Sequence, residues 1–399
     1  MTRDSSMPNG IHIAIVVFGP VYTALLTQIT LANLAALVRE IPDDLRELSR
    51  VRIMTTATDA CTIEQARTLK LLREHIDVEV LDRAKLHGHD THGDYGPMVV
   101  SQRLLVVEAM RADAALFFIG PDLILNKGAF AALVSRFREG YRLVIGPGPR
   151  INRRTAVAEL KNRIAESPDG AFALAPREHA ALLFRHWHCV NSQYLIESPS
   201  SYWWKAYVCY RPRPEELLFR SFQGPTFAAW PARIDENFNG FIDHQLAAVC
   251  CESWRQIYII PDSDECLALD LTEDDRRDML PPADLLAPFL LSQLFDHAAI
   301  KDMYLRCGVR ACRVHSGESD SQSVAAWQRE FDRVVDPLVV IALGERSVGR
   351  HAGPMVAKIY RTLCLWSTHT LLFVLGPIAS RMVHKWKVSA PLNSGPISQ

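Results

Sequence analysis

The chain has 399 residues, of which 48% are hydrophobic and 22% charged, and its formal net charge is -1. This length fits either one large α/β domain with additions or roughly two to three smaller domains. The lack of an overall basic field argues against nucleic-acid binding. Nine cysteines are scattered without a CxxC pair, which favours reduced thiols in the cytoplasm over a structural zinc site. The polar N-terminus shows no secretory signal.

The N-terminal part alternates between buried-strand and helix patterns. Residues 11–18 form an apolar, β-branched run that ends at Gly19-Pro20, and residues 22–41 carry leucine and isoleucine at helical spacing. Strand patterns at 51–55 and 76–81 flank a helical pattern at 63–75. Parallel strands need crossover connections, which are usually helices. The succession therefore predicts an α/β fold with a mostly parallel, doubly wound sheet flanked by helices.

The most informative stretch is DAALFFIGPDLILNKGAF, at 113–130. Its buried-strand pattern ends at Gly120-Pro121-Asp122, and a short apolar run then leads into a helical pattern at 129–137. In open α/β sheets ligands collect at the carboxyl ends of the strands. We therefore expect a functional site at Asp122. The structural alternative is a carboxylate that caps a helix or stabilises a turn.

A histidine-rich polar loop offers a competing site. Its HGHDTH sequence contains His87, His89 and His92, and it resembles the HxHxDH zinc motif of metallo-hydrolases. Its aspartate falls one residue early for that ligand set. We interpret the loop as a polar connection. The alternatives are a loop that contacts an acceptor or a metal, and a metal-dependent hydrolase site, which elemental analysis would test. Dinucleotide, P-loop and serine-hydrolase motifs are absent from suitable strand-to-helix contexts.

Residues 150–270 alternate helical patterns with turn-rich segments, which we interpret as insertions that complete a cleft. Arg150, Arg153 and Arg154 follow a glycine-proline turn and can bind phosphates in a bidentate way, or form a solvated basic turn. Asp262 and Asp264 follow a strand pattern and can be metal-binding or general-base residues, although turn chemistry explains them equally well. An aromatic cluster could stack on a sugar or base, although core packing is favoured. Its members are Tyr202, Trp203, Trp204, Tyr207 and Tyr210.

The C-terminal part predicts a second region. We place one domain at 10–270 and a helical extension at 271–399. Within the extension, residues 362–380 contain no Asp, Glu, Lys or Arg, and basic residues flank them on both sides. This run reaches the roughly 18 residues of a membrane span. Three interpretations of this run remain open: a helix packed in the core or between domains, a helix lying on the bilayer surface, and a transmembrane helix. We expect membrane-surface association through 362–387, and hence a cytoplasmic protein that is peripheral at the inner membrane.

Three segments together resemble a bacterial GT-A-type glycosyltransferase, the class with a Rossmann-like fold that uses nucleotide-diphosphate sugars. They are the opening strand IAIVVFG, the middle strand ALFFIGPDLILNKGAF and the downstream WPARIDENF, and the resemblance covers about residues 11–265. In that family the middle strand usually ends in Asp-x-Asp, which holds Mn²⁺ or Mg²⁺ against the donor diphosphate. Here the triplet is Gly120-Pro121-Asp122, so the motif is degenerate and retains one carboxylate.

The resemblance implies roles for individual residues. Gly19, Tyr22, Asp122 and Arg153 are implied in donor binding, and Asp122 is also implied in metal binding. His315 is the implied second metal ligand, with a surface-loop histidine as its structural alternative.

Acceptor-side acids are implied at Asp235 and Glu236, either of which could act as general base; Asp243 and His244 are the next choice. An Asx turn with helix capping is an equally good interpretation of that segment.

These observations predict transfer of a sugar from a nucleotide-sugar donor to an acceptor hydroxyl, in cell-surface glycan or glycolipid synthesis. The expected acceptor is a glycan or a lipid-linked molecule, and the expected cofactor is Mn²⁺ or Mg²⁺. The alternative is a catalytically silent GT-A-like protein that binds nucleotide sugars or acts as a scaffold. Gly120 supports this alternative, because it stands where the second metal-binding carboxylate is expected.

Overall fold

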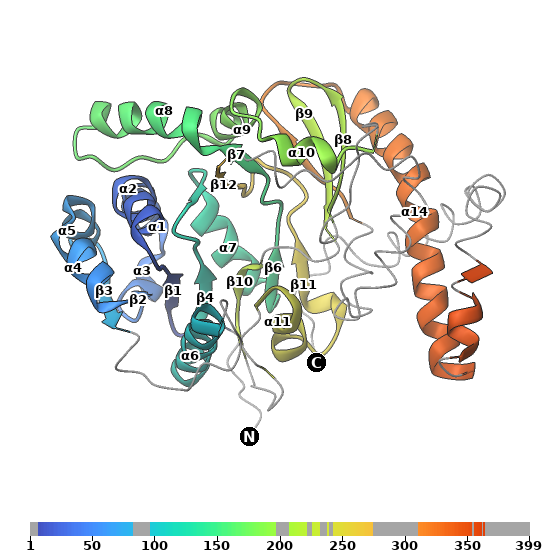
Figure 1. Ribbon diagram of the computed structural model, residues 1–399, viewed down its shortest axis with the longest axis horizontal. Helices are drawn as coiled ribbons and strands as arrows, with labels where there is room; N and C mark the ends of the chain where they lie inside the picture. The colour runs from blue at the N-terminus through green and yellow to red at the C-terminus, as the bar shows by residue number, and fades with distance from the viewer. Residues whose placement is uncertain are drawn as a thin grey trace. The chain divides into compact units, whose positions relative to one another are not determined.

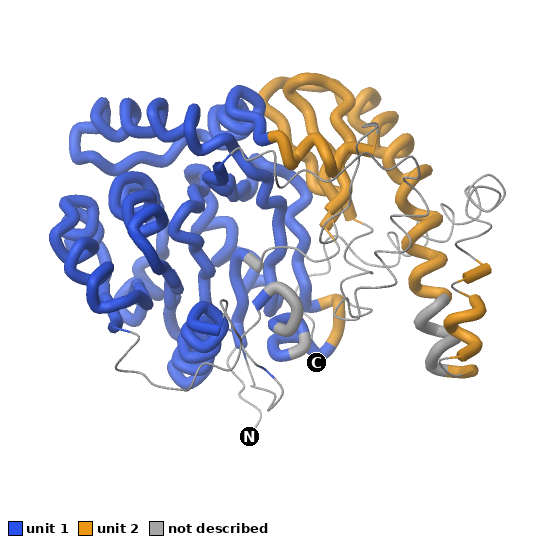
Figure 2. Tube along the Cα trace, in the orientation of Figure 1, with its two compact units in different colours: residues 1–188, 225–252, 256–274 blue, residues 189–224, 253–255, 275–399 orange. Residues whose placement is uncertain are grey.

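The computed structural model describes residues 7–82, 96–196, 207–221, 226–231, 238, 242–273, 310–352, 355–360 and 362–363. The chain divides into two compact units, which Figure 2 shows in blue and orange. Unit 1 consists of residues 1–188, 225–252 and 256–274. Unit 2 consists of residues 189–224, 253–255 and 275–399.

A seven-stranded sheet forms the centre of unit 1, with strand order β11-β6-β10-β4-β1-β2-β3 (Figure 1). The pairs β1–β2, β2–β3, β1–β4 and β6–β11 are parallel, whereas β10 is antiparallel to both β4 and β6. The expected mostly parallel sheet is therefore confirmed. The strands are β1 (Ile11–Val16), β2 (Arg50–Thr55), β3 (Asp77–Asp82), β4 (Ala115–Phe118), β6 (Leu143–Ile145), β10 (Thr226–Ala229) and β11 (Ile257–Ile259).

Strand β1 is covered on both faces, since Ile11 to Ile15 are all buried although successive side chains point to opposite sides. The helix Ala129–Arg138 matches the helical pattern predicted at 129–137, whereas the pattern predicted at 63–75 corresponds to the end of one helix and the whole of the next, which are separated at Ala66. Besides the first crossover, the described helices of unit 1 are, in chain order, α3 (Asp43–Arg46), α4 (Ala57–Gln65), α5 (Arg67–Arg73), α6 (Gly96–Ala112), α7 (Ala129–Arg138), α8 (Arg153–Glu166), α9 (Pro176–Arg185) and α11 (Ile242–Cys250).

The first crossover is one continuous helical run, Pro20–Glu40, made of α1 (Pro20–Leu25), the π-helical η1 (Leu26–Thr30), α2 (Leu31–Leu37) and the 3₁₀ turn η2 (Val38–Glu40). This run is the one helix among the described residues that is long and apolar enough to cross a membrane. However, 67% of its apolar window is buried. It is therefore a core helix of unit 1.

A smaller sheet, β5-β12-β7, continues from the carboxyl end of β4 (Figure 1). Its strands are β5 (Leu123–Leu125), β12 (Ala268–Thr272) and β7 (Arg150–Asn152). The buried Asn33 of α2 holds β5 in place. It accepts a hydrogen bond from the backbone N–H of Leu125 at 2.9 Å, and its amide donates to the carbonyls of Leu125 and Phe172 at 3.0 and 3.1 Å. The first crossover helix thereby fixes the segment that follows Asp122.

Unit 2 contains an antiparallel sheet, β13-β9-β8, and a long helix. Its elements are α10 (Cys189–Gln193), β8 (Tyr207–Arg213), β9 (Glu216–Ser221), β13 (Cys312–His315) and α14 (Ser321–Ala352). The fully buried Arg220 of β9 forms ion pairs with Asp332 and Asp336 of α14. These contacts place 189–224 with the C-terminal part. The predicted first domain, 10–270, included this segment, because pairing with a strand about a hundred residues later leaves no local signal.

Candidate functional site

The order of the central strands marks one position in unit 1 for a ligand site. The chain begins in β1, moves outward to β2 and β3, and then crosses to β4 on the other side of β1. After the carboxyl end of β1 the chain therefore turns to one side of the sheet, and after the carboxyl end of β4 it turns to the other. Ligands of open α/β sheets bind in the crevice at such a switch point. The segments that follow these two strands carry Tyr22 and Asp122.

The turn after β1 is held by Asp59 of α4. The backbone N–H of Gly19 and the hydroxyl of Thr23 donate to the two Asp59 carboxylate oxygens, each at 3.0 Å. Burial acts to raise the pKa of Asp59, but these bonds and one from Thr56 outweigh it and lower that pKa. Gly19 has a φ of 86°, a conformation that favours glycine. Its N–H is thus already engaged, and its described role is to shape the turn that presents Tyr22.

Asp122 lies in the turn after β4, anchored through its neighbours. The carbonyl of Pro121 accepts a hydrogen bond from Thr30 at 2.7 Å, and the carbonyl of Asp122 accepts one from the N–H of Leu271 at 2.8 Å. Asp122 does not cap the following helix, because Gly128 occupies the N-cap position of α7. The capping interpretation of Asp122 is therefore wrong.

A second carboxylate, from Asp270 of β12, lies beside Asp122. Burial, the negative charge of Asp270 and a hydrogen bond between the two carboxyl groups raise the pKa of Asp122 to about 7. Asp270 also accepts a hydrogen bond from the Thr272 hydroxyl at 2.8 Å. Two carboxylates this close resist double ionisation, so the pair keeps a proton up to about pH 7 unless a cation lies between them.

Two arginines complete the cluster. The guanidinium of Arg150 lies 4.0 Å from the Asp270 carboxylate, and Arg153, in the first turn of α8, forms an ion pair with Glu273. Both arginines and both aspartates act on Tyr22. Burial, Asp122 and Asp270 raise the pKa of the Tyr22 phenol, and the arginines partly oppose this. We call Tyr22, Asp122, Arg150, Arg153 and Asp270 the Asp122 cluster.

Gly120 explains how this cluster departs from an Asp-x-Asp motif. A Cβ atom built on Gly120 would lie 3.0 Å from the Asp122 carboxylate oxygen Oδ1. A carboxylate at position 120 would therefore stand beside Asp122. In this chain the carboxylate beside Asp122 is that of Asp270 in β12. Sequence reasoning missed Asp270; the available signal was a lone acid inside the apolar run LALDL.

His315 belongs to unit 2, where it ends β13. It is buried rather than exposed in a surface loop, so the structural alternative for this residue is wrong. Its Nδ1 lies 3.1 Å from the carbonyl of Gly317. Because a carbonyl can only accept, Nδ1 carries the proton, which places the lone pair of the neutral ring on Nε2. The prediction that His315 binds the same metal as Asp122 stays a prediction, since the two residues belong to different units.

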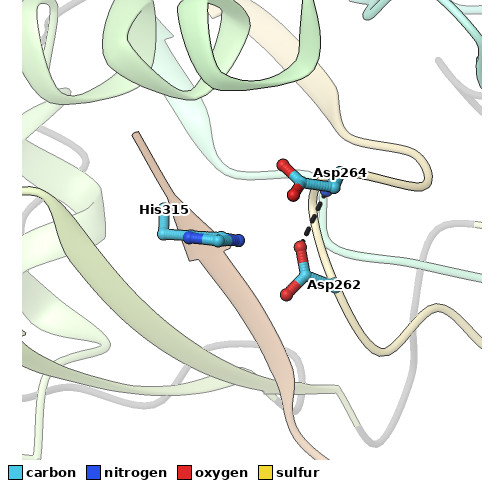
Figure 3. A group of neighbouring side chains, drawn as sticks. All are labelled: Asp262, Asp264 and His315. Carbon is cyan, nitrogen blue, oxygen red and sulfur yellow. Dashed lines mark hydrogen bonds between the residues drawn. The ribbon is translucent and has the colours of Figure 1, made fainter. Parts of the chain in front are cut away.

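Asp262 and Asp264 form a turn after β11 in unit 1. Figure 3 shows the hydrogen bond from the backbone N–H of Asp264 to the Asp262 carboxylate, at 2.8 Å, and it also draws His315 of β13. Arg177 of α9 donates to both carboxylate oxygens of Asp264, at 2.5 and 2.7 Å. These contacts are those of an Asx turn and a bidentate ion pair, which fits the turn interpretation. The alternative role of Asp262 and Asp264 as metal or base residues stays a prediction.

Several predicted residues lie outside the described part of the chain. They include Asp235 and Glu236, the histidine loop, and the aromatic residues 202–204. Asp243 and His244 fall in α11, but their side chains are not among those described. Tyr207 and Tyr210 lie on β8 and pack against Phe219 and Phe331 respectively, which fits the packing interpretation for these two members.

No protein-family model matches the sequence, and no curated protein matches it. Among solved structures, the chain is similar to a mannosyltransferase from Pyrobaculum calidifontis, PcManGT, in complex with GDP-Man and Mn²⁺. The TM-score is 0.33 at 10% identity, over 96% of this chain and 86% of that one.

The chain is also similar to mouse xyloside xylosyltransferase 1 in its apo form, with a TM-score of 0.23 at 16% identity. That match covers 41% of this chain and 61% of the other. Both matched proteins are glycosyltransferases. At these TM-scores the likenesses are weak, and we base the function on the geometry of the Asp122 cluster.

Proposed function

We propose that this protein transfers a sugar from a nucleotide-sugar donor to an acceptor hydroxyl, with the donor diphosphate bound at the Asp122 cluster. The observation that carries the proposal is the pairing of Asp122 with Asp270 at the switch point of the unit 1 sheet. Two carboxylates, two arginines and a phenol converge there. Carboxylates can hold a divalent cation against a diphosphate, arginines can bind its oxygens, and an aromatic ring can pack on a sugar or base.

The carboxylate oxygens of the Asp122 cluster are suitable ligands for a divalent cation. Asp122 and Asp270 offer hard oxygen ligands. Burial and the negative charge of Asp270 raise the pKa of Asp122, and a cation between the two carboxylates would relieve their repulsion. They are the residues that would hold Mn²⁺ or Mg²⁺. When bound, such an ion neutralises negative charge on the departing diphosphate.

The other members of the cluster act on the donor directly. Arg150 and Arg153 can donate charge-assisted hydrogen bonds to phosphate oxygens, with Arg153 exchanging its Glu273 partner for a phosphate. Tyr22 is 45% exposed, so its ring can pack on a base or sugar. Its raised pKa keeps the phenol protonated and able to donate. Asp235 or Glu236 is the proposed base for the acceptor hydroxyl.

The test is a screen of the purified protein against UDP-, GDP- and CDP-linked sugars with Mn²⁺, measuring binding and sugar release. We expect one donor to bind and turn over, and Asp122→Asn to lower turnover at least about a hundredfold. Asp44→Asn is the matched control, since it removes the same charge from an exposed ion pair with Arg138. Absence of binding to every donor would refute the proposal.

The catalytically silent alternative makes a different prediction in the same screen. It expects nucleotide-sugar binding that is indifferent to Mn²⁺, without turnover. By itself, the Gly120-Pro121-Asp122 triplet favours this alternative, because it has a single carboxylate. The second carboxylate from Asp270 weakens it, because the pair of oxygen ligands is restored from another strand.

A further inference from the structure

The helical segment that follows α14 in unit 2 exposes an apolar stripe. Met355, Val356, Ile359 and Leu363 are 74%, 42%, 53% and 64% exposed. At 3.6 residues per turn, these positions fall within an arc of about 100° on one side of the helix. Such exposure of four large apolar side chains on a single face indicates a binding surface rather than scattered surface residues.

The other side of this segment packs on α14. Ala357 is buried, and the hydroxyl of Tyr360 lies 2.5 Å from the position that a Cβ on Gly344 would occupy. These two residues lie about 90° to 150° from the middle of the stripe. The segment therefore uses a different face for packing within unit 2, and the stripe is left outward among the described residues.

The charge of the C-terminal sequence is strongly one-sided. The last acidic residue is Glu345, and residues 346–399 contain seven basic residues and no acid. Since the whole chain has a net charge of -1, residues 1–345 carry -1 minus +7, or -8. The basic residues are Arg346, Arg350, Lys358, Arg361, Arg381, Lys385 and Lys387.

We propose that the segment 355–363 lies on an anionic lipid bilayer, with the stripe in the acyl boundary and Lys358 among the headgroups. Amphipathic helices with basic flanks bind membranes in this way. The sequence beyond Leu363 is consistent with a bilayer as the partner, since it has no Asp, Glu, Lys or Arg up to residue 380. It also contains Trp366 and Trp386, and tryptophan is enriched at membrane interfaces. A second copy of this chain is a less suitable partner for the stripe, because the basic C-terminal sequences of the two copies would repel each other. The proposal stands independently of sugar transfer.

The experiment is sedimentation of the full-length protein with vesicles of phosphatidylcholine alone, and of phosphatidylcholine mixed with phosphatidylglycerol. We expect binding to the mixed vesicles that weakens at high salt. Ile359→Asp should lower the partition coefficient at least about tenfold, because a charge would enter the apolar boundary. Lys358→Gln should lower it roughly fivefold on the mixed vesicles only. Ala326→Asp, at an exposed position of α14, is the control and should change it less than about twofold.

Three results would overturn the proposal. The first is failure of the unaltered protein to bind either vesicle. The second is loss of a dimer in analytical ultracentrifugation on Ile359→Asp without any vesicle binding, which would assign the stripe to a second copy. The third is a lowered melting temperature of Ile359→Asp relative to Ala326→Asp, which would show that the stripe is covered within the folded chain.

Discussion

At the scale of single residues, Asp122 depends on a partner that is distant in sequence. Asp122 comes from the turn after β4, and Asp270 reaches it because β12 pairs with β5, with Asp270 opposite Leu123. The pair supplies two oxygen ligands where the triplet ending at Asp122 supplies one. Glycine at position 120 leaves the space against the Asp122 carboxylate open. Strand pairing thus brings beside Asp122 a second carboxylate that the local sequence does not supply.

The raised pKa of Asp122 predicts a specific pH dependence of stability without metal. Between the ordinary pKa of an aspartate, 3.8, and about 7, the unfolded chain releases this proton while the folded protein keeps it. The contribution of Asp122 to the free energy of unfolding therefore falls as pH rises through this window, and levels off above it. We expect Asp122→Asn, compared with the unaltered protein, to gain roughly 1–3 kcal/mol between about pH 4 and pH 7.

Urea denaturation in the presence of a chelator, at several pH values, measures this difference. Asp44→Asn should show no such gain across the same window, because its carboxylate is exposed and paired with Arg138. If the free energy of unfolding of Asp122→Asn differed from that of the unaltered protein by the same amount at every pH, the raised pKa of Asp122 would be contradicted.

At the scale of elements, the parts that sequence predicts well are those with a local cause. The strands β1 to β4, the first crossover helix and α7 follow from apolar runs, helical spacing and turn residues, all of which lie within a short window. The insertion of the antiparallel β10 between β4 and β6 leaves no such signal, and neither does the pairing of β5, β12 and β7. Asp122 could be singled out because it ends a predicted strand. Asp270 could not be linked to it, because register between distant strands is set by tertiary packing.

Asn33 is the side chain that connects the first crossover helix to the site. Its three buried hydrogen bonds to Leu125 and Phe172 are lost in Asn33→Ala, which leaves backbone groups of β5 without partners. We expect this change to lower the free energy of unfolding by roughly 2–4 kcal/mol. Asn9→Ala, which removes a single exposed hydrogen bond to Ala112, should cost less than about 1 kcal/mol. Equal costs for the two changes in urea denaturation would show that Asn33 does not anchor β5.

At the scale of the whole molecule, the chain is divided by contacts and not by sequence order. The segment 189–224 interrupts unit 1 in sequence yet belongs to unit 2, because β9 pairs with β13 and Arg220 binds α14. Arg220 is fully buried, and the negative charges of Asp336 and Asp332 offset the cost of burying it. A buried ion network of this kind costs most when one partner is removed.

We therefore expect Arg220→Ala to destabilise unit 2 by roughly 3–5 kcal/mol, because it leaves Asp336 buried without its cation. The matched control is Arg138→Ala, which breaks an exposed pair with Asp44 and should cost at most about 1 kcal/mol. Hydrogen exchange followed along the chain would locate the effect. Loss of protection in β9 and α14 is expected, and unchanged protection in both would contradict the role given to Arg220.

The central claim is that Asp122 and Asp270 together form the metal-dependent part of a nucleotide-sugar site. Its most direct test is calorimetric titration of Mn²⁺, with and without the bound donor, into the unaltered protein, Asp122→Asn, Asp270→Asn and the double variant. We predict that each single change weakens Mn²⁺ binding at least about tenfold, and that the double change costs little more, since two ligands of one ion are not independent. Mn²⁺ binding in Asp270→Asn equal to that of the unaltered protein would contradict the claim.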